Sequence, residues 1–546
     1  MVEKTAGQSV VFEPTTAQGL RRGINQMADM LRPTLGPHPR LVALHQGNDF
    51  GLAPALLDNG SVICRGVRQL ADRDADLGAM FVRRLVWQQN DLAGDGTTTA
   101  AILLQSIFNQ GLAYLAGGGS AMALRRYLKE GLQIIRRELA AMAAPVEGEK
   151  AVAQVAASVC HDPELARYLG EVFAIIGEYG RLVIREGQER GVKREYIEGA
   201  YWDGGILSHD MLALPTAETK IARDQRTLHG ELENAAVLMT DGDIKEPEDL
   251  IPILRLVLGQ GLRRLFIIAA SVSERALAML HANRAAGVLS SLAVKAPGAL
   301  GEDTAAALED IAYLTGGRPI SVMSGETFAQ ARPDDLGLAR RVWAAADRFG
   351  LRGGAGNPHE LRRHITRLRA ACQTTDDPAR RKKLRDRIGV LIGGAAVLWV
   401  GGATEAELGV RMELAERSAE VLRGALREGI VPGGGAAFMA CRRALREHLA
   451  QCADPDERAA YRILIRALEE PARVLAANSG YSPSAIIAQM DLLGPGYTFD
   501  MRPGRMVAVE QTGLSDVAAV LRMAITGAVS SAALALTTGV IVHHKR

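Results

Sequence analysis

The sequence predicts a multidomain protein of the α+β and α/β classes, with helical ends that flank an α/β middle. Three observations lead to this prediction. The chain has 546 residues, which is too long for one compact core. Helical periodicity dominates up to about residue 145 and again from about residue 358 onward. Between about 180 and 330, short apolar runs alternate with helical patterns, as if an α/β domain were inserted into another domain.

The composition favours a folded protein that does not act mainly on nucleic acid. Hydrophobic residues make up 48% of the chain and charged residues 23%, which is enough apolar surface for large cores. The 64 basic and 62 acidic residues nearly balance and aromatics are only 4%, so we expect no nucleic-acid partner. The five cysteines include no CxxC pair and no zinc spacing, which favours a reduced, cytoplasmic compartment.

The first third of the chain predicts helices around one short strand. Apolar residues from Leu20 to Leu31 are spaced by four, three and four, which places them on one helix face. A cluster of proline and glycine ends this helix, and residues 41–44 predict a short strand. A further helix is expected to begin near Thr97, and long helical patterns follow it.

The middle third predicts a largely parallel sheet with helices between its strands. Strands are expected at 236–239, 265–269 and 292–294, and helices at 250–258 and 276–280. Ser271 and Glu274 resemble a capping box in front of the second helix. The polar run 214–235 is expected to be a surface excursion.

The last third is again mostly helical. A charged helix pair is expected over 358–391, with its turn at 374–378, and a further helix over 403–427. Residues 523–542 carry no charge, but serine, threonine and glycine interrupt them. A membrane span would be more apolar, so we expect a buried helix followed by a strand, and no membrane partner.

The densest chemical signal is the run AGDGTTTA at 93–100. Its glycines let the backbone approach a ligand, and its threonines open a helix whose N-terminus favours phosphate. Asp95 provides a hard oxygen ligand for a magnesium ion on a nucleotide. An ordinary capped helix after a glycine turn explains the same residues, so the run alone does not decide the function.

Six short motifs, taken in their order along the chain, indicate a resemblance to a known family. They are TLGP (34–37), AGDGTTTA (93–100), VKAPG (294–298), LTGG (314–317), ATE (403–405) and EGIVPGGG (428–435). Together they resemble the group I chaperonins, the GroEL family, from about residue 15 to 543. The resemblance implies an equatorial domain from 1–141 and 428–546, an intermediate hinge domain from 142–198 and 396–427, and an inserted α/β apical domain from 199–395.

The resemblance also implies that the equatorial domain binds ATP and Mg²⁺, with Asp95 as the metal ligand. Thr498 stands where the family has an asparagine near the adenine. The implied ATP-binding residues are Thr34, Leu35, Gly36, Pro37, Asp95, Gly96, Thr97, Thr98, Thr99, Gly434 and Asp516.

Hydrolysis is where the sequence departs from the family. Asn59 and Arg417 stand where the family has its two water-activating aspartates, and Asp58 lies one residue early as a doubtful substitute base. An amide and a guanidinium cannot accept a proton at neutral pH, so we expect weakened ATP hydrolysis. Arg417 lies off the apolar stripe of its helix and is expected to be exposed until the domains close. It is then a solvated surface residue, or it reaches the γ-phosphate or pairs with Asp58 or Asp95.

The implied client surface is also altered. Asp210, His281 and Ala282 replace larger apolar residues of the family. The implied polypeptide-binding residues are Ile206, Met211, Ile251, Leu254 and Leu277.

Two functions therefore stay open. The first is an ATP-driven chaperone that assists the folding of non-native polypeptides inside a double ring of identical subunits, closed by a GroES-like co-chaperonin. The second is a non-hydrolysing, nucleotide-holding subunit of mixed chaperonin rings, or a passive holdase. Family membership and the phosphate loop favour the first function, whereas Asn59 and Arg417 favour the second.

Overall fold

The computed structural model describes residues 2–544 except 6–7, 38, 46–54, 58, 214–218, 225–226, 299–300, 376 and 510–512. The chain forms two compact units. The first unit contains both chain ends, Met1–Ala174 and Gly409–Arg546, and the second is the inserted segment Ile175–Leu408. The predicted insertion of one domain into another is therefore confirmed. Both boundaries fall inside the predicted intermediate domain, so the division into three domains stays a prediction.

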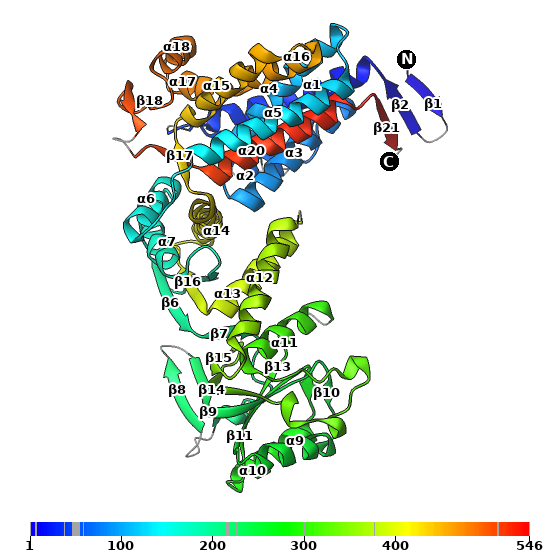
Figure 1. Cartoon of the computed structure of the whole chain (residues 1–546), viewed down its shortest axis with the longest axis vertical. Helices are drawn as coiled ribbons and strands as arrows, with labels where there is room; N and C mark the ends of the chain where they lie inside the picture. Colours follow the sequence, from blue (N-terminus) through cyan, green and yellow to red (C-terminus); the bar gives the residue numbers. More distant parts are fainter. Residues whose placement is uncertain are drawn as a thin grey trace. The chain divides into compact units, whose positions relative to one another are not determined.

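The first unit is mainly helical (Figure 1). Its elements in the N-terminal part are β1 (Val2–Thr5), β2 (Gln8–Phe12), α1 (Thr15–Leu31), η1 (Arg32–Thr34), β3 (Val42–Leu44), β4 (Ala55–Leu57), α2 (Gly60–Gly66), α3 (Arg73–Ala93), α4 (Thr97–Ala116), α5 (Ala121–Met142), α6 (Glu149–Val159) and α7 (Pro163–Ile176). In the C-terminal part they are α14 (Glu405–Glu428), β17 (Ile430–Pro432), α15 (Ala436–Gln451), α16 (Pro455–Ala467), α17 (Glu470–Asn478), α18 (Pro483–Leu493), β18 (Tyr497–Asp500), β19 (Arg505–Ala508), β20 (Ser515–Val517), α20 (Ala518–Leu536) and β21 (Val540–His544).

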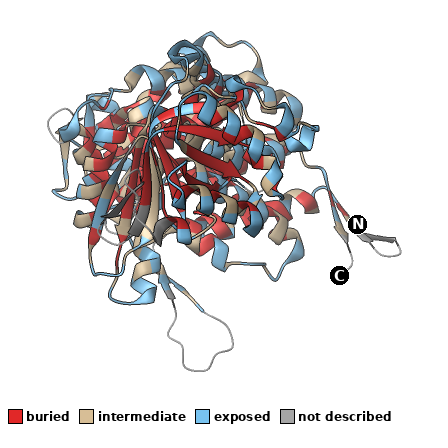
Figure 2. Ribbon diagram, turned by 90° about the horizontal axis from the view of Figure 1, so that it is seen from below, coloured by how far each residue is buried: buried red, intermediate tan, exposed pale blue. Residues whose placement is uncertain are grey.

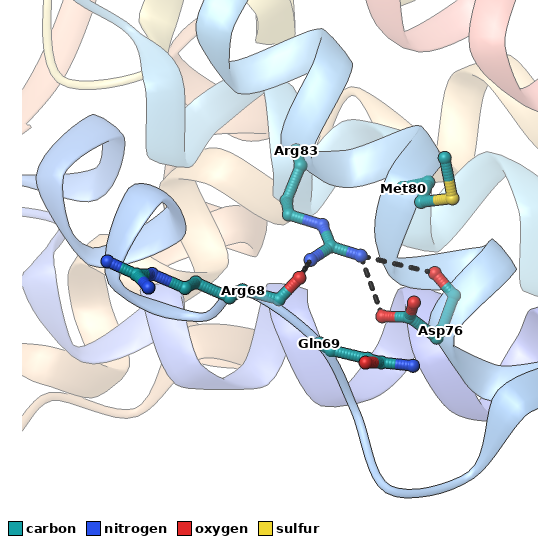
Figure 3. Close-up of a pocket in the computed structure, with 5 residues that line it drawn as sticks. All are labelled: Arg68, Gln69, Asp76, Met80 and Arg83. Carbon is teal, nitrogen blue, oxygen red and sulfur yellow. Dashed lines mark hydrogen bonds and ion pairs between the residues drawn. The ribbon is translucent and has the colours of Figure 1, made fainter. Parts of the chain in front are cut away.

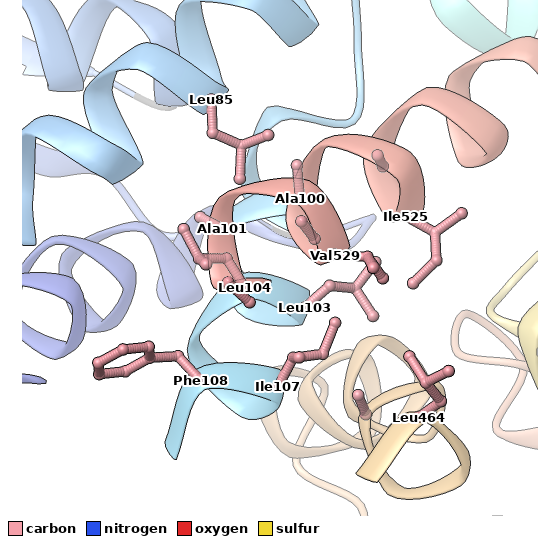
Figure 4. Close-up of a cluster of buried hydrophobic side chains, with 14 of the residues drawn as sticks. Leu85, Ala100, Ala101, Leu103, Leu104, Ile107, Phe108, Leu464, Ile525 and Val529 are labelled. Atoms are coloured by element: carbon pink, nitrogen blue, oxygen red, sulfur yellow. The ribbon is translucent and has the colours of Figure 1, made fainter. Parts of the chain in front are cut away.

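The core of the first unit forms around α4 and α20, which come from opposite ends of the chain (Figure 4). Leu103 and Ile107 of α4 and Ile525 and Val529 of α20 are fully buried in one cluster with Leu464 of α16. Helices α3 and α5 pack against α20 as well. Burial of this apolar surface is the main force that joins the two ends of the chain.

The uncharged run 523–542 forms a buried helix and a following strand, as expected. By length and composition, α20 is the one described helix that would suffice to cross a membrane. However, Ala524, Ile525, Ala528 and Val529 are fully buried inside the first unit. The strand β21 pairs with β2 of the N-terminus.

The second unit is an α/β body, and its central strands are buried (Figure 2). Its strands are β5 (Arg181–Glu186), β6 (Val192–Glu198), β7 (Ala200–Asp203), β8 (Thr219–Asp224), β9 (Thr227–Met239), β10 (Asp243–Ile244), β11 (Arg264–Ala269), β12 (Ser271–Val272), β13 (Ser290–Lys295), β14 (Gly337–Ala344), β15 (Arg348–Gly354) and β16 (Gly394–Val400). Its helices are α8 (Asp210–Ala213), α9 (Pro247–Gly259), α10 (Glu274–Ala285), α11 (Glu302–Thr315), η2 (Val322–Ser324), η3 (Phe328–Gln330), η4 (Pro333–Asp335), α12 (Pro358–Thr374) and α13 (Pro378–Ile392).

In the main sheet, two of the six strand pairings are parallel. Its strand order is β13-β11-β9-β14-β15-β7, with β8 paired to β9. Strands β13, β11 and β9 are parallel as predicted, whereas β14, β15 and β7 join antiparallel. The largely parallel sheet predicted from the alternating pattern is therefore correct only for β13, β11 and β9.

The polar run 214–235 is not simply a surface excursion, because part of it forms β8 and the first half of β9. Glu231 of β9 is buried, and both of its carboxylate oxygens accept hydrogen bonds from Arg341 of β14, at 2.5 and 3.1 Å. This ion pair explains how a charged segment enters the sheet.

The capping residue of α10 also differs from the prediction. Ser271 lies in β12, and Ser273 caps the helix by accepting a hydrogen bond from the backbone N–H of Ala276 at 3.2 Å. Glu274 is the first residue of the helix and not its third. The charged helix pair over 358–391 is present as α12 and α13, with its turn where expected.

Candidate functional site

The phosphate-type loop joins α3 to α4 through Gly94, Asp95 and Gly96. Both glycines have positive φ angles, 69° and 79°, which other residues rarely adopt. Gly96 caps α4 without any side chain, so within the described residues no side chain caps the first-turn N–H groups of α4. The buried residues Thr97, Thr98 and Thr99 form that turn. This is the geometry of an anion site at a helix N-terminus.

Asp95 lies at the rim of this loop. Its side chain is exposed, and its Oδ1 accepts a hydrogen bond from Gly96 N at 2.7 Å. Its backbone oxygen accepts a hydrogen bond from the buried side chain of Gln89, also at 2.7 Å. No local pattern marks Gln89 as a site residue, because its second partner, the carbonyl of Val520, is 431 residues away. Asp95 thus retains a free carboxylate face for a hard cation.

The predicted turn at 34–37 lies against the same loop. Thr34 Oγ1 and Thr98 Oγ1 are 2.9 Å apart and share a hydrogen bond. Asn478 of α17 donates hydrogen bonds to the backbone oxygens of Arg32 and Leu35, at 2.8 and 2.7 Å. Asn478 is a second positioning residue that sequence reasoning missed, because no local motif marks it. Gly36 has a φ of 123°, which fits the predicted role of a tight turn.

Gly434 and Asp516 are brought together by a pair of short strands. In the β17–β20 ladder Asp516 lies opposite Val431, and Gly433 N donates to Leu514 O at 3.0 Å. A Cβ at Gly434 would lie 2.7 Å from Thr498 Oγ1, which is too close for any side chain. The Thr498 hydroxyl itself donates to Gly433 O at 2.9 Å and is buried. Thr498, at the position where the family has an asparagine, therefore holds the glycine turn in this chain.

Asp516 and Asp95 share one electrostatic environment. Burial and the like charge of Asp95 raise the pKa of Asp516 to about 7. Two carboxylates from distant parts of the chain are thus close enough for their charges to repel each other. Such a pair is costly to ionise without a cation or hydroxyl donor nearby, and a magnesium nucleotide provides both. These residues therefore fit the ATP and Mg²⁺ that the sequence predicts.

Asn59 has a structural task beside the loop. It caps α2 by accepting a hydrogen bond from Ser61 N at 2.9 Å. The next residue, Gly60, lies so close to the loop that a Cβ would be 2.8 Å from Thr97 Oγ1. The amide is thus near the phosphate loop but engaged in capping. Asp58, the doubtful substitute base, lies outside the described residues.

Helix α14 contacts the loop through the backbone of Arg417. A Cβ at Gly94 would overlap the backbone carbonyl oxygen of Arg417, so helix and loop are in close contact. The sequence predicts that Arg417 is exposed until the domains close, whereas the structure has it partly buried. One turn earlier on α14, Glu413 forms an ion pair with Arg65 of α2 at 2.8 Å. Helices α2, α4 and α14 therefore meet around one loop.

The five predicted polypeptide-binding residues differ in exposure. Ile206, Met211 and Leu254 are buried in the core of the second unit, and Leu277 is partly buried against it. Only Ile251 of α9 is exposed, at 37% of its full area. Leu258, two turns further along α9, is also exposed. Apolar surface available to a client on α9 is thus limited to a narrow strip.

A surface pocket at the N-terminal half of α3 is a separate feature (Figure 3). Arg83 donates to the backbone oxygens of Val67 and Arg68 and forms a 2.7 Å ion pair with Asp76. Its charge is therefore satisfied within the chain. The phosphate loop follows the opposite, C-terminal end of α3. We assign the pocket a structural role, in which Arg83 anchors the segment between α2 and α3.

Comparison with known proteins decides the family. The model of the TCP-1/cpn60 chaperonin family matches residues 27–546. The chain belongs to the TCP-1/cpn60 chaperonin family. The match covers the phosphate loop, both strands of the β17–β20 pair and the inserted unit.

The chaperonin fold is also found in a solved relative. The structure of the chaperonin gp146 from the bacteriophage EL 2 (Pseudomonas aeruginosa), in the presence of ATP-BeFx, superposes with a TM-score of 0.68. The two sequences are 19% identical, and the alignment covers 98% of this chain and 99% of that chain. A second crystal form of the same protein gives a TM-score of 0.62. This likeness confirms the predicted multidomain chaperonin fold over nearly the whole chain.

Proposed function

We propose that this chaperonin subunit binds Mg-ATP at the N-terminus of α4, hydrolyses it slowly, and assists non-native polypeptides in a cytoplasmic ring. The observation that carries this proposal is the convergence of Thr34, Asp95, the first turn of α4 and Asp516 on one site. These groups come from three separate segments of the chain. Structural stability alone does not require two carboxylates to lie close enough to repel each other.

Each group has a defined task toward the nucleotide. The first-turn N–H groups and hydroxyls of α4 would bind phosphate oxygens, and Asp95 would hold the Mg²⁺, which neutralises phosphate charge. Asp516 would accept a hydrogen bond from the ribose. Gly434 would let the backbone approach the nucleoside, and a side chain at this position would clash with Thr498.

The proposed slow turnover rests on what Asn59 and Arg417 do. Asn59 lies beside the loop, but its side-chain oxygen accepts the capping hydrogen bond of α2. Arg417 carries no basic oxygen and stays protonated. Loss of a general base typically costs about 10²–10⁴-fold in rate. A nucleotide-holding subunit of mixed rings, or a passive holdase, is the second candidate function, and the same two residues favour it.

The test is Mg²⁺-dependent ATP turnover measured beside nucleotide binding on the same sample, with Asp95→Ala as the control. We expect the wild type to bind ATP tightly and to hydrolyse it slowly. In Asp95→Ala, we expect weaker binding and even slower hydrolysis. Binding without turnover would favour the nucleotide-holding subunit. Turnover at a rate ordinary for chaperonins would contradict the proposed role of Asn59 and Arg417. Sedimentation of the same samples reports whether the chain forms rings alone or, with a GroES-like co-chaperonin, a closed complex.

A further inference from the structure

Helices α12 and α13 of the second unit carry an excess of positive charge. Together they contain ten arginine and lysine residues and only two acidic residues, whereas the whole chain has 64 basic and 62 acidic residues. The two helices share one apolar cluster, to which α12 contributes Leu368 and α13 contributes Ile388 and Leu391. Seven of the ten basic residues are exposed, namely Arg362, Arg363, Arg367, Arg369, Arg380, Lys382 and Lys383.

Acidic residues of α11 neutralise only some of these cations. Lys383 and Arg387 of α13 each form a 2.7 Å ion pair with an aspartate of α11. By contrast, Arg363, Arg380 and Lys382 have no ion-pair partner within the part of the chain that the structure describes. We call these three exposed residues the basic surface.

The placement of the charges does not serve the stability of α13. Residues 380–383 are four consecutive basic residues in the first two turns of this helix, and its first turn has no acidic residue. The dipole of a helix favours negative charge at its N-terminus, and neighbouring like charges on a helix repel each other. The cap Asp377 offsets part of this cost. A negatively charged partner would offset more of it, which points to a binding role for the exposed cations.

The chemistry of the two helices indicates which kind of polyanion fits them. Arginine binds carboxylates through paired N–H groups, and lysine adds a mobile point charge. Neither helix contains a phenylalanine, tyrosine or tryptophan on which a nucleic-acid base could stack. A flexible polypeptide rich in aspartate and glutamate can follow such a surface without a fixed shape of its own.

We infer that the basic surface of α12 and α13 binds acidic segments of non-native polypeptides. The inference rests on the proposed function and adds a class of client to it. The narrow apolar strip on α9 would contact apolar segments of any client. The basic surface would add a preference for clients with an excess of negative charge.

The experiment measures the binding of two fluorescent unfolded peptides to the full-length chaperonin by fluorescence anisotropy, without nucleotide. The peptides share the same glycine, serine and leucine residues and differ only in carrying glutamates or lysines. We expect the glutamate peptide to bind more tightly and its affinity to fall as salt is added. Arg380→Glu combined with Lys382→Glu should lower that affinity by about tenfold, because two attractions become two repulsions.

The matched control is Arg190→Glu combined with Arg340→Glu. These are two exposed arginines elsewhere in the second unit, and the pair changes the net charge by the same amount. Because salt screens distant charges, the control should lower the affinity for the glutamate peptide by less than about threefold.

Thermal unfolding separates binding from a structural role. Arg380→Glu with Lys382→Glu should melt at or above the wild-type temperature, because it places negative charge near the N-terminus of α13. A lower melting temperature would show that the cations stabilise the fold, and it would overturn the inference.

The remaining outcomes of the binding experiment are distinct. If the wild type binds neither peptide, the proposed binding of polypeptides fails and the inference with it. If the wild type binds both peptides equally, or if the α13 variant loses no more affinity than the control, only the inference fails. If a single-stranded oligothymidine binds more tightly than the glutamate peptide and the α13 variant loses that binding, the surface belongs to nucleic acid and the inference is overturned.

Discussion

At the scale of single residues, Asn59 shows how a position near a reaction site can be kept for structure. Its side chain caps α2 through Ser61 N, and α2 presses Gly60 against the threonines of α4. Asparagine and aspartate cap helices about equally well, whereas alanine does not. The cap therefore does not explain why the chain has an amide here in place of a carboxylate.

We predict that Asn59→Asp leaves α2 as stable as in the wild type, whereas Asn59→Ala destabilises it by about 1 kcal/mol. Hydrogen exchange of the α2 amides measures this, and alanine should speed it about fivefold. Equal exchange rates in the alanine variant and the wild type would show that the cap contributes nothing to α2.

The missing carboxylates lead to a second prediction at this scale. Asn59→Asp together with Arg417→Asp should raise ATP turnover if the rest of the pocket is sound, because both carboxylates of the family would be restored. The steady-state rate of phosphate release measures this. Unchanged turnover in the double variant would show that the loss is not confined to these two positions.

The folded structure disfavours the charged form of Asp516. Its pKa is raised to about 7, whereas an unfolded chain has an aspartate pKa near 3.8. The folded state therefore binds a proton between these values that the unfolded state does not. This contribution to stability is fully present below about pH 4 and is lost as the pH rises through about 7.

We predict that nucleotide-free wild type loses stability between about pH 5 and pH 8 relative to Asp516→Asn, which cannot ionise. Urea unfolding of both proteins at the two pH values measures the difference. Asp500→Asn, a change at a partly buried aspartate in β18, is the control and should follow the wild type. Parallel pH profiles for wild type and Asp516→Asn would contradict the shared environment of Asp95 and Asp516.

At the scale of elements, the packing of α14 on the phosphate loop depends on a glycine. Gly94 ends α3 with a φ of 69°, and α14 lies where its side chain would be. Gly118 serves as the control for Gly94, because it has a φ of 94° and open space where a side chain would be. The two glycines thus share a positive φ but differ in the space around them.

We predict that Gly118→Ala costs about 1 kcal/mol, from the positive φ alone. Gly94→Ala should cost clearly more and also weaken nucleotide binding, because α14 must move away from the loop. Thermal unfolding and ADP binding of the two variants measure this. Equal losses of stability with unchanged binding would show that the contact between α14 and the loop has no bearing on the site.

At the scale of the whole molecule, the two units have separate cores. Phe266 and Phe349, whose ring centroids are 5.6 Å apart, belong to the core of the second unit. Asp310 of α11 forms a hydrogen bond with His364 of α12 and an ion pair with Arg387 of α13, each at 2.7 Å, and these contacts fasten both helices to α11 within the same unit. The segment is continuous in sequence, so it can be produced without linkers.

We predict that residues 175–408 fold cooperatively when expressed alone, because their core is closed within the segment. A single sharp thermal transition and protected amides in β9 and β11 are the expected results. A fragment without protected amides would show that the second unit depends on the first. Asp310→Asn, which removes the charge that pairs with Arg387 and weakens the hydrogen bond to His364, should lower the melting temperature of the fragment.

The family, the helical ends, the inserted α/β unit and the phosphate loop could all be predicted from the sequence. These features are encoded locally, because helical periodicity, glycine turns and short motifs act over a few residues. The same locality explains the errors. The antiparallel part of the sheet contains the pair Glu231–Arg341, whose residues are far apart in sequence. The cap of α10 is set by backbone geometry, and the sequence alone does not show whether Ser271 or Ser273 adopts it.

Which groups meet at the site depends on tertiary contacts that no local pattern encodes. The fold places Asn478 under the turn at 34–37, Asp516 beside Asp95, and Arg417 against Gly94. It also buries Ile206 and Met211, which the family resemblance implied as client contacts. The reason is physical: burial, unsatisfied donors and like-charge repulsion are properties of neighbours in space, and these neighbours are hundreds of residues apart or separated by whole elements.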